Sequence, residues 1–247
     1  MDSTVNGESV VDNISRQTKK GDSDMDQKLF WSAMLKFLSG LLLVGLLLFL
    51  PAGTFAYWQG WLLIGILFVP MFIAGLVMMA KNPDLLRKRL KAKEEQTEQK
   101  QVIALSGLMF LAAFILAGLN FRFAWIVLPR WIVWTAALLF LLAYLLYAEV
   151  LRENAYLSRT IEVQENQKVI DTGLYGIVRH PMYAATILLF LTIPLVLGSL
   201  LSFAVMLLYL PIIAKRIRNE EAVLERGLAG YVDYKKRVKY QVIPGIW

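Results

Sequence analysis

The chain has 247 residues, 57% of them hydrophobic, and a mean hydropathy of +0.54, which is typical of a protein that crosses a membrane several times. It has no cysteine and one histidine, so disulfides, thiolate nucleophiles and metal sites built from cysteines or several histidines are excluded. The net charge is +7, but the basic residues flank apolar runs, which favours an anionic membrane leaflet over nucleic acid as the partner.

Residues 1–29 are polar and mixed in charge, and they predict a flexible cytosolic tail in front of one membrane domain at 30–247. Four apolar runs predict transmembrane helices at about 33–50, 58–80, 102–120 and 131–150. Tryptophans lie near the ends of these runs, as in the aromatic belts of membrane proteins. Between the second and third runs, DLLRKRLKAKEEQTEQK suits either a helix in the membrane interface or a solvated loop.

The segment from Met182 to Ala214 has 33 residues and no charge. As one straight helix it would measure about 50 Å, against roughly 30 Å of bilayer hydrocarbon, whereas two full spans and a turn need more chain. Pro194, Gly198 and Ser199 interrupt its middle. We therefore predict a helix-turn-helix hairpin with short arms, whose two ends return to the same side of the membrane.

Loop charge supports this layout. With four spans and a hairpin, 23 of the 26 lysines and arginines fall on one side of the membrane. Only Arg122 and Arg130 fall on the other side, and Lys36 lies inside the first span. The positive-inside rule then places both termini and the ends of the hairpin in the cytosol.

The predicted fold is an all-α polytopic membrane protein, with about four transmembrane helices followed by the hairpin and an interfacial C-terminal helix. The alternation around Ile161 and Val163, with a turn at Glu165-Asn166, is also compatible with a small β-hairpin that returns through 168–170. The chain ends in VIPGIW, an apolar tail suited to the interface.

Charged residues lie at both ends of the predicted hairpin. Arg179 and the start of the helix at Pro181 can bind an anion such as a carboxylate. Glu220 and Glu221 can accept hydrogen bonds from an ammonium or from ribose hydroxyls. These groups suit a zwitterionic ligand that carries an amine and a sugar. Each motif alone also has a purely structural interpretation, as a helix start or as a solvated helix.

The motifs TGLYGIVRHPMY, RNEEAVL, GYVDYKKRV and IPGIW, together with the uncharged hairpin, resemble the isoprenylcysteine carboxyl methyltransferase family. The wider group includes membrane phospholipid N-methyltransferases, and the resemblance covers about Arg152 to Trp247. It implies S-adenosylmethionine as methyl donor, released as S-adenosylhomocysteine, on the cytosolic side beside the hairpin. It also implies a lipophilic acceptor from the bilayer, and no metal.

The resemblance also implies site residues. Arg179, His180, Pro181 and Tyr183 match the family's RHPxY, Glu220-Glu221 its EE pair, and Tyr231, Tyr234 and Arg237 its YxxYxxRV element. The expected cofactor-binding residues are Gly173, Tyr175, Arg179, His180, Pro181, Tyr183, Glu220, Glu221, Tyr231 and Tyr234. Candidates for a direct role in catalysis are Arg179, Tyr183 and Glu221. Arg152, Glu153 and Asn154 either line the acceptor side or end the fourth span.

RGLAGY stands where the family more usually has FGxxY, which leaves the local turn and the acceptor open. The function expected from the resemblance is methylation of a lipophilic acceptor, with an isoprenylcysteine carboxylate as first choice. A phospholipid amine and a lipophilic thiol are the alternatives, and a membrane scaffold or carrier is the non-enzymatic one. No GxGxxG follows a predicted strand, so the sequence does not encode a soluble Rossmann-type methyltransferase.

Overall fold

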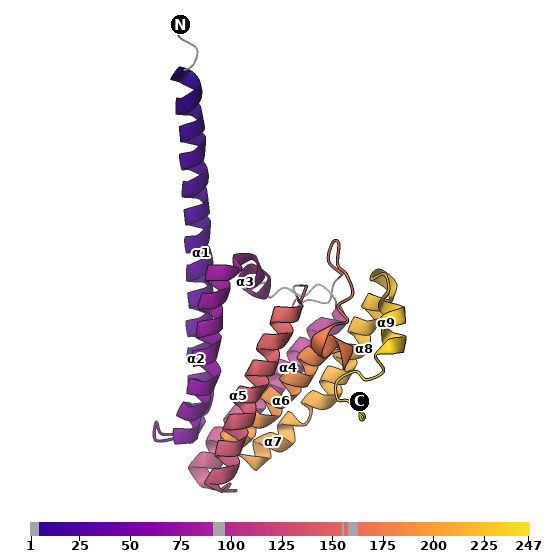
Figure 1. The fold of residues 1–247 in the computed structure, drawn as a ribbon. Coiled ribbons are helices and arrows are strands. Elements are labelled where there is room, and N and C mark those ends of the chain that lie inside the picture. Colours follow the sequence, from indigo (N-terminus) through magenta and orange to yellow (C-terminus); the bar gives the residue numbers. More distant parts are fainter. Residues whose placement is uncertain (1–4, 91–96, 155, 158–162) are drawn as a thin grey trace.

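The computed structural model describes residues 5–90, 97–154, 156–157 and 163–247, and in these residues all regular secondary structure is helical (Figure 1). Within them, five segments are long and apolar enough to cross a membrane: Gln27–Ala52, Trp58–Lys81, Gln101–Phe123, Arg130–Glu153 and Leu200–Gly227. The prediction of an all-α polytopic membrane protein is confirmed.

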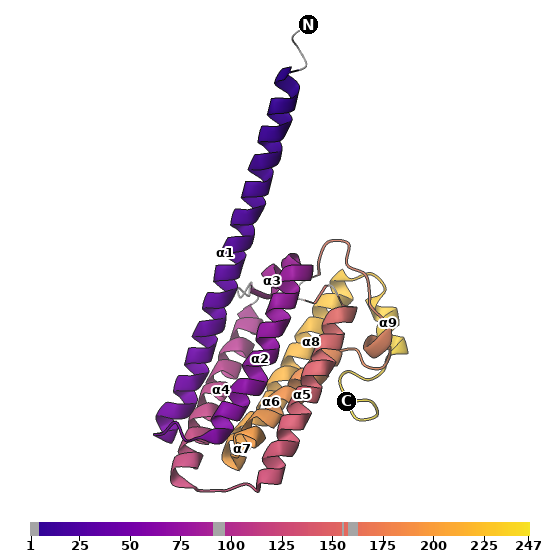
Figure 2. The same ribbon diagram turned by 60° about the vertical axis from the view of Figure 1, so that its left-hand side comes forward.

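The first two helices form an antiparallel pair at one side of the bundle (Figures 1 and 2). Helix α1 spans Val5–Ala52 and α2 spans Trp58–Lys81, which is within one residue of the predicted second span. Helix α1 begins far before its apolar run, so residues 5–29 are helical here and not irregular as we expected. No proline precedes Pro51, and extending an existing helix is much easier than nucleating one. The flexibility and the cytosolic location of this segment stay predictions.

Helix α3 (Pro83–Leu90) is short, and its last carbonyl accepts a hydrogen bond of 2.5 Å from the Lys36 ammonium of α1. Helix α4 (Thr97–Phe123) runs beside α1 (Figure 2). The two backbones come very close at Gly118. Helix α5 (Arg130–Glu153) packs along α6 (Pro181–Val196), the first arm of the hairpin, and also contacts α2.

The predicted hairpin is present, but only its first arm is short, because the second arm, Leu200–Gly227, is long enough to cross a membrane. Its first arm is α6 (Pro181–Val196), and its second arm is α7 (Leu200–Met206) followed by α8 (Tyr209–Gly227). The 16 residues of α6 span about 24 Å, less than the hydrocarbon thickness. At the tip Gly198 has φ +71°, a conformation that favours glycine, and the Ser199 hydroxyl accepts a hydrogen bond from Ser202 N.

Buried polar groups hold this tip against the rest of the bundle. The Tyr57 hydroxyl donates to Leu197 O at 2.7 Å, and the Ser202 hydroxyl donates to Ala113 O at 2.8 Å. The Asn120 amide donates to Gly198 O at 3.3 Å. The bonds to Leu197 O and Gly198 O satisfy carbonyls of the turn, and the three bonds together fix the turn on α4 and on the start of α2.

The last part of the chain returns to the open end of the hairpin. Helix α9 spans only Tyr231–Arg237, and after it the backbone N–H groups of Gln241, Val242 and Ile243 donate to Trp247 O. The segment after α5 has a turn at Gln164–Gln167 but no strand among its described residues. The alternative of a β-hairpin is therefore wrong for 163–170, where Val163 and Val169 pack on the end of α8 and on α9 instead. Ile161 lies outside the described residues.

Candidate functional site

The two ends of the hairpin lie together, as the charge pattern predicted, and a buried ion pair joins them. Arg179, just before α6, donates through Nε to Glu221 Oε1 on α8 at 2.7 Å, and both residues are less than 10% exposed. The Nε2 atom of His180 lies 3.1 Å from the same carboxylate oxygen. The other carboxylate oxygen is 3.0 Å from Lys235 Nζ and 3.2 Å from Gln241 Nε2. Glu221 is therefore surrounded by donors from α9, the RHP motif and the C-terminal segment.

The RHP motif is locally ordered by the same contacts. Pro181 occupies the first turn of α6, where its missing N–H costs nothing. The N–H groups of Arg179 and His180 donate to Tyr240 O and Gln241 O at 2.9 and 2.8 Å, and Arg179 Nη1 donates to Val238 O and Lys239 O. Arg179 thus fastens the C-terminal segment to the hairpin.

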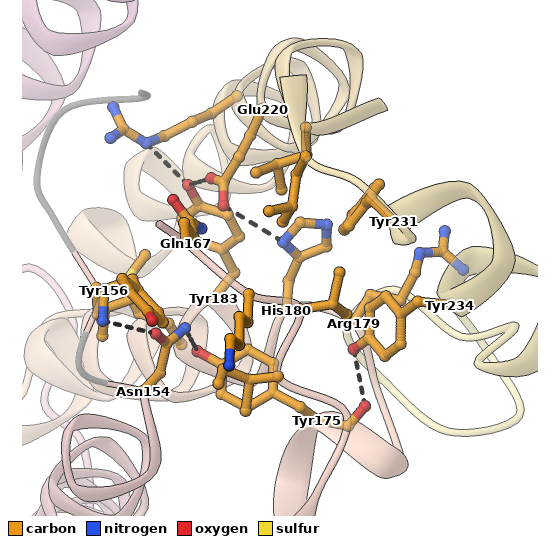
Figure 3. Close-up of a pocket in the computed structure, with 18 residues that line it drawn as sticks. Asn154, Tyr156, Gln167, Tyr175, Arg179, His180, Tyr183, Glu220, Tyr231 and Tyr234 are labelled. Carbon is orange, nitrogen blue, oxygen red and sulfur yellow. Dashed lines mark hydrogen bonds and ion pairs between the residues drawn. The ribbon is translucent and has the colours of Figure 1, made fainter. Parts of the chain in front are cut away.

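Glu220 has different surroundings from its neighbour. Its carboxylate accepts the hydroxyl hydrogen of Tyr183, and its other oxygen lies 3.8 Å from His180 Nδ1 (Figure 3). The Tyr183 hydroxyl in turn accepts from Arg216 Nε at 3.0 Å. The Glu220 side chain is 24% exposed, so it is accessible to a ligand, while the Glu221 side chain is only 6% exposed.

A pocket opens beside these groups, at the open end of the hairpin (Figure 3). It holds about 840 Å³ of space when its mouth and the adjoining solvent are included. Its walls are formed by the loop after α5, the RHP motif, α6, α8 and α9. They contribute Asn154, Tyr156, Leu157, Gln167, Lys168, Val169, Ile170, Tyr175, Arg179, His180, Met182, Tyr183, Arg216, Glu220, Leu224, Leu228, Tyr231 and Tyr234.

Most of the residues expected from the sequence line this pocket. Those that do are Asn154, Tyr175, Arg179, His180, Tyr183, Glu220, Tyr231 and Tyr234. Those that do not are Gly173, Pro181, Glu221, Arg152 and Glu153. Arg179 and Glu221 are brought together as we expected, but they bind each other. Their roles in cofactor binding or catalysis stay predictions.

The three residues at the end of α5, Arg152, Glu153 and Asn154, lie in different surroundings. Arg152 pairs with Glu149 on the exposed surface. Glu153 accepts hydrogen bonds from the Thr172 hydroxyl and from Leu174 N, and so caps the 3-10 helix η1 (Gly173–Gly176). Asn154 reaches the pocket, where its amide donates to the Tyr175 hydroxyl at 2.9 Å. The structural interpretation therefore fits Arg152 and Glu153, whereas Asn154 lies where it can contact a ligand.

Gly173 is required by this capping. Its φ is +50°, and a Cβ atom there would lie 2.0 Å from Glu153 Oε1. The hydroxyl of Tyr234 donates to Tyr175 O at 2.7 Å and holds η1 against α9. The turn thus presents the Tyr175 ring to the pocket.

Sequence reasoning missed the loop wall of the pocket, made by Tyr156, Leu157 and residues 167–170. A turn holds the loop: Gln167 N donates to Gln164 O, and Asn166 at its corner has φ +57°, which asparagine tolerates better than most residues. Val169 lies 3.9 Å from the Cβ position of Gly230 in the α8–α9 turn. The Asn in a polar stretch signalled the turn, but not that its far side covers a pocket.

Tyr231 is the clearest ligand-facing group. It is 4% exposed and lines the pocket, and its hydroxyl has no hydrogen-bond partner among the described residues. Burial, and next the charge of Glu221, raise the pKa of Tyr231 well above its usual range, so its hydroxyl stays a donor. A buried hydroxyl without a partner costs about 1–3 kcal/mol, which a ligand could recover.

The polar and aromatic groups that line the pocket fit S-adenosylmethionine. Glu220 can accept from an amine or from ribose hydroxyls, the unpaired Tyr231 hydroxyl can bond a polar atom, and aromatic walls suit an adenine. In the described part of the chain, no group of three or more acidic or histidine side chains could hold a metal ion.

The geometry defines a polytopic membrane protein with a pocket at the open end of a helical hairpin. Comparison with known proteins shows that part of this chain is similar to a known family. Residues 131–229, from α5 to the α8–α9 turn, match the model of the phospholipid methyltransferase family. This confirms the predicted resemblance to the wider group of membrane methyltransferases for that part of the chain.

A curated relative has another activity in its name. The Delta(14)-sterol reductase TM7SF2 of Mus musculus is 29% identical over 91 residues, which are 36% of this chain and 22% of the reductase. The matched part thus covers only about a fifth of that protein's length.

Proposed function

We propose that this protein transfers a methyl group from S-adenosylmethionine to a lipophilic acceptor at the cytosolic boundary of the membrane. The observation that carries the proposal is the pocket at the open end of the hairpin, with Glu220 and the unpaired Tyr231 hydroxyl in its walls. The family match at 131–229 contains the RHP motif, the hairpin and both glutamates, and so supports the same chemistry.

The cofactor, when bound, supplies an activated methyl group. Glu220 and Tyr231 bind its polar groups, and Tyr183 and Arg216 hold the Glu220 carboxylate in place. The Arg179–Glu221 pair keeps the hairpin ends and the C-terminal segment at a fixed separation. A rigid frame of this kind favours transfer because well-oriented reactants can gain about 7–11 kcal/mol.

The acceptor decides whether a base is needed. An isoprenylcysteine carboxylate, our first candidate, reacts without losing a proton, and so does a thiolate. A phospholipid amine, which the matched family's description brings to the fore, must be unprotonated, and Glu220 is the accessible carboxylate that could take the proton.

The test uses membranes that contain the protein and S-adenosylmethionine with a labelled methyl group. Mass spectrometry of the extracted lipids and prenylated peptides should find the label in one lipophilic class. Glu220→Gln should reduce the transfer at least tenfold, while Glu225→Gln, on the same helix and outside the pocket, should retain it. No labelled product in any of the three acceptor classes would contradict the proposal.

Reduction of a sterol-like double bond is a second candidate, favoured by the similarity to the sterol reductase. Such a reaction needs a hydride donor, for which a reduced nicotinamide nucleotide is the usual source. Binding of that nucleotide to the purified protein, without binding of S-adenosylmethionine, would favour reduction over methyl transfer.

A further inference from the structure

We infer that Lys168, and not Arg179, binds the acidic group of the ligand in the hairpin pocket. This inference rests on the proposed function, in which the ligand is S-adenosylmethionine and the acidic group is its carboxylate. It follows from asking which cations in the pocket walls are free to bind.

Arg179 is not free. Its guanidinium donates to Glu221 and to the carbonyls of Val238 and Lys239, at 2.7–2.8 Å, and the residue is 7% exposed. Turning it toward a ligand would break these bonds and leave the Glu221 carboxylate buried with fewer donors. Losing one partner of a buried ion pair is strongly destabilising.

Arg216 is also committed. Its Nε atom donates to the Tyr183 hydroxyl, which itself donates to Glu220. An acidic ligand group at Arg216 Nε would have to displace the Tyr183 hydroxyl, which is bonded to Glu220. His180 lies between the two glutamates, and it too faces carboxylates.

Lys168 differs from these three residues. It lines the pocket and is exposed, and among the described residues its ammonium makes no hydrogen bond or ion pair. Its main chain is fixed on both sides, by the turn between Gln164 and Gln167 and by the contact of Val169 with the α8–α9 turn. The backbone is thus ordered, while the charged end can move to meet a ligand.

The pocket therefore has one group of each charge for a ligand. Lys168 offers a free cation on the loop, and Glu220 offers an accessible carboxylate on α8. The amino-acid part of S-adenosylmethionine carries the complementary pair, a carboxylate and an ammonium. Lys168 would then select ligands that keep the carboxylate.

The experiment compares two ligands that differ only in this group, S-adenosylmethionine and its decarboxylated form, by calorimetric titration of the purified full chain. The unaltered protein should prefer S-adenosylmethionine. Lys168→Gln should weaken its binding about five- to tenfold and leave the affinity for the decarboxylated form unchanged. Lys168→Arg should restore the preference.

Lys239→Gln removes the same charge from an exposed side chain outside the pocket, and should leave both affinities unchanged. If Lys168→Gln weakens both ligands equally, or neither, the assignment is overturned while the proposed function stands. If the unaltered protein binds neither ligand, the proposed function fails and the inference fails with it.

Discussion

The adjacent Glu220 and Glu221 occupy opposite kinds of environment, although the sequence shows them as an identical pair. Glu221 is buried and accepts from several cationic or polar groups, whereas Glu220 is accessible from the pocket. A buried carboxylate with this many partners stabilises the fold, and an accessible one can exchange partners with a ligand. The two should therefore respond differently to the same substitution.

Glu221→Gln should destabilise the protein by about 3–5 kcal/mol, because Arg179 would remain buried without a counter-charge. Glu220→Gln should change stability much less and weaken ligand binding instead. Thermal unfolding in detergent, with and without S-adenosylhomocysteine, separates the two effects. Equal loss of stability in both variants would contradict the division of roles.

Tyr231→Phe removes a buried hydroxyl that has no partner among the described residues. Without ligand, the variant should be as stable as the original protein or slightly more stable, since the desolvation cost disappears. Its ligand affinity should fall about five- to tenfold. A clear loss of stability with unchanged affinity would show that the hydroxyl is a structural group.

The raised pKa of Tyr231 gives a matching pH dependence. Because burial raises it above the unfolded value of about 10, folding binds the proton more tightly, and this contribution to stability is lost as the pH rises above about 10. Tyr231→Phe should lessen the loss of stability between pH 9 and pH 11. Superimposable pH profiles for the two proteins would contradict the assignment.

For individual residues, the sequence predicted which of them gather at the site, but not which of them bind each other. The motif spacing located Arg179 and Glu221 at the two ends of the hairpin. Their direct pairing depends on how the C-terminal segment packs, because carbonyls of that segment orient the arginine. Such long-range contacts leave no signal in local sequence.

Among the elements, α1 and α4 come very close together at Gly118. A Cβ atom at this position would lie 2.6 Å from Leu48 O, a backbone atom that cannot move without shifting α1. Gly118→Ala should therefore destabilise the protein, and thermal unfolding should show a lower Tm. Gly107→Ala on the same helix meets nothing within 4 Å and should be neutral or slightly stabilising, as alanine favours helix. Equal Tm values for the two variants would contradict the packing.

The hairpin was the element most predictable from the sequence, since an uncharged segment of this length fits the membrane only when it folds back. The segments after α5 were less predictable. Turn residues marked where the chain reverses at 164–167, but the decision between strand pairing and packing on α8 and α9 depends on tertiary contacts. The start of α1 was not predicted, because the polar composition of residues 5–29 indicates contact with water and does not show where a helix begins.

For the whole molecule, we propose that the site faces the cytosol, because most basic residues and the pocket belong to the same end of the bundle. Since the chain has no cysteine, single substitutions can report the side directly. In intact cells, Val127→Cys, exposed between α4 and α5, should react with a membrane-impermeant thiol reagent. Lys239→Cys should react only after permeabilisation. The reverse pattern would contradict the orientation.

The central claim is that loop 163–170 and the two hairpin ends form one pocket for an adenosyl ligand, and protection from alkylation tests it most directly. Cysteines would be placed in turn on the loop wall at Gln167, on α8 at Leu224, and outside the pocket at the exposed Val232. S-adenosylhomocysteine should slow the alkylation of Gln167→Cys and Leu224→Cys at least tenfold and leave that of Val232→Cys unchanged. Unchanged alkylation at both pocket positions, or protection on one wall alone, would contradict it.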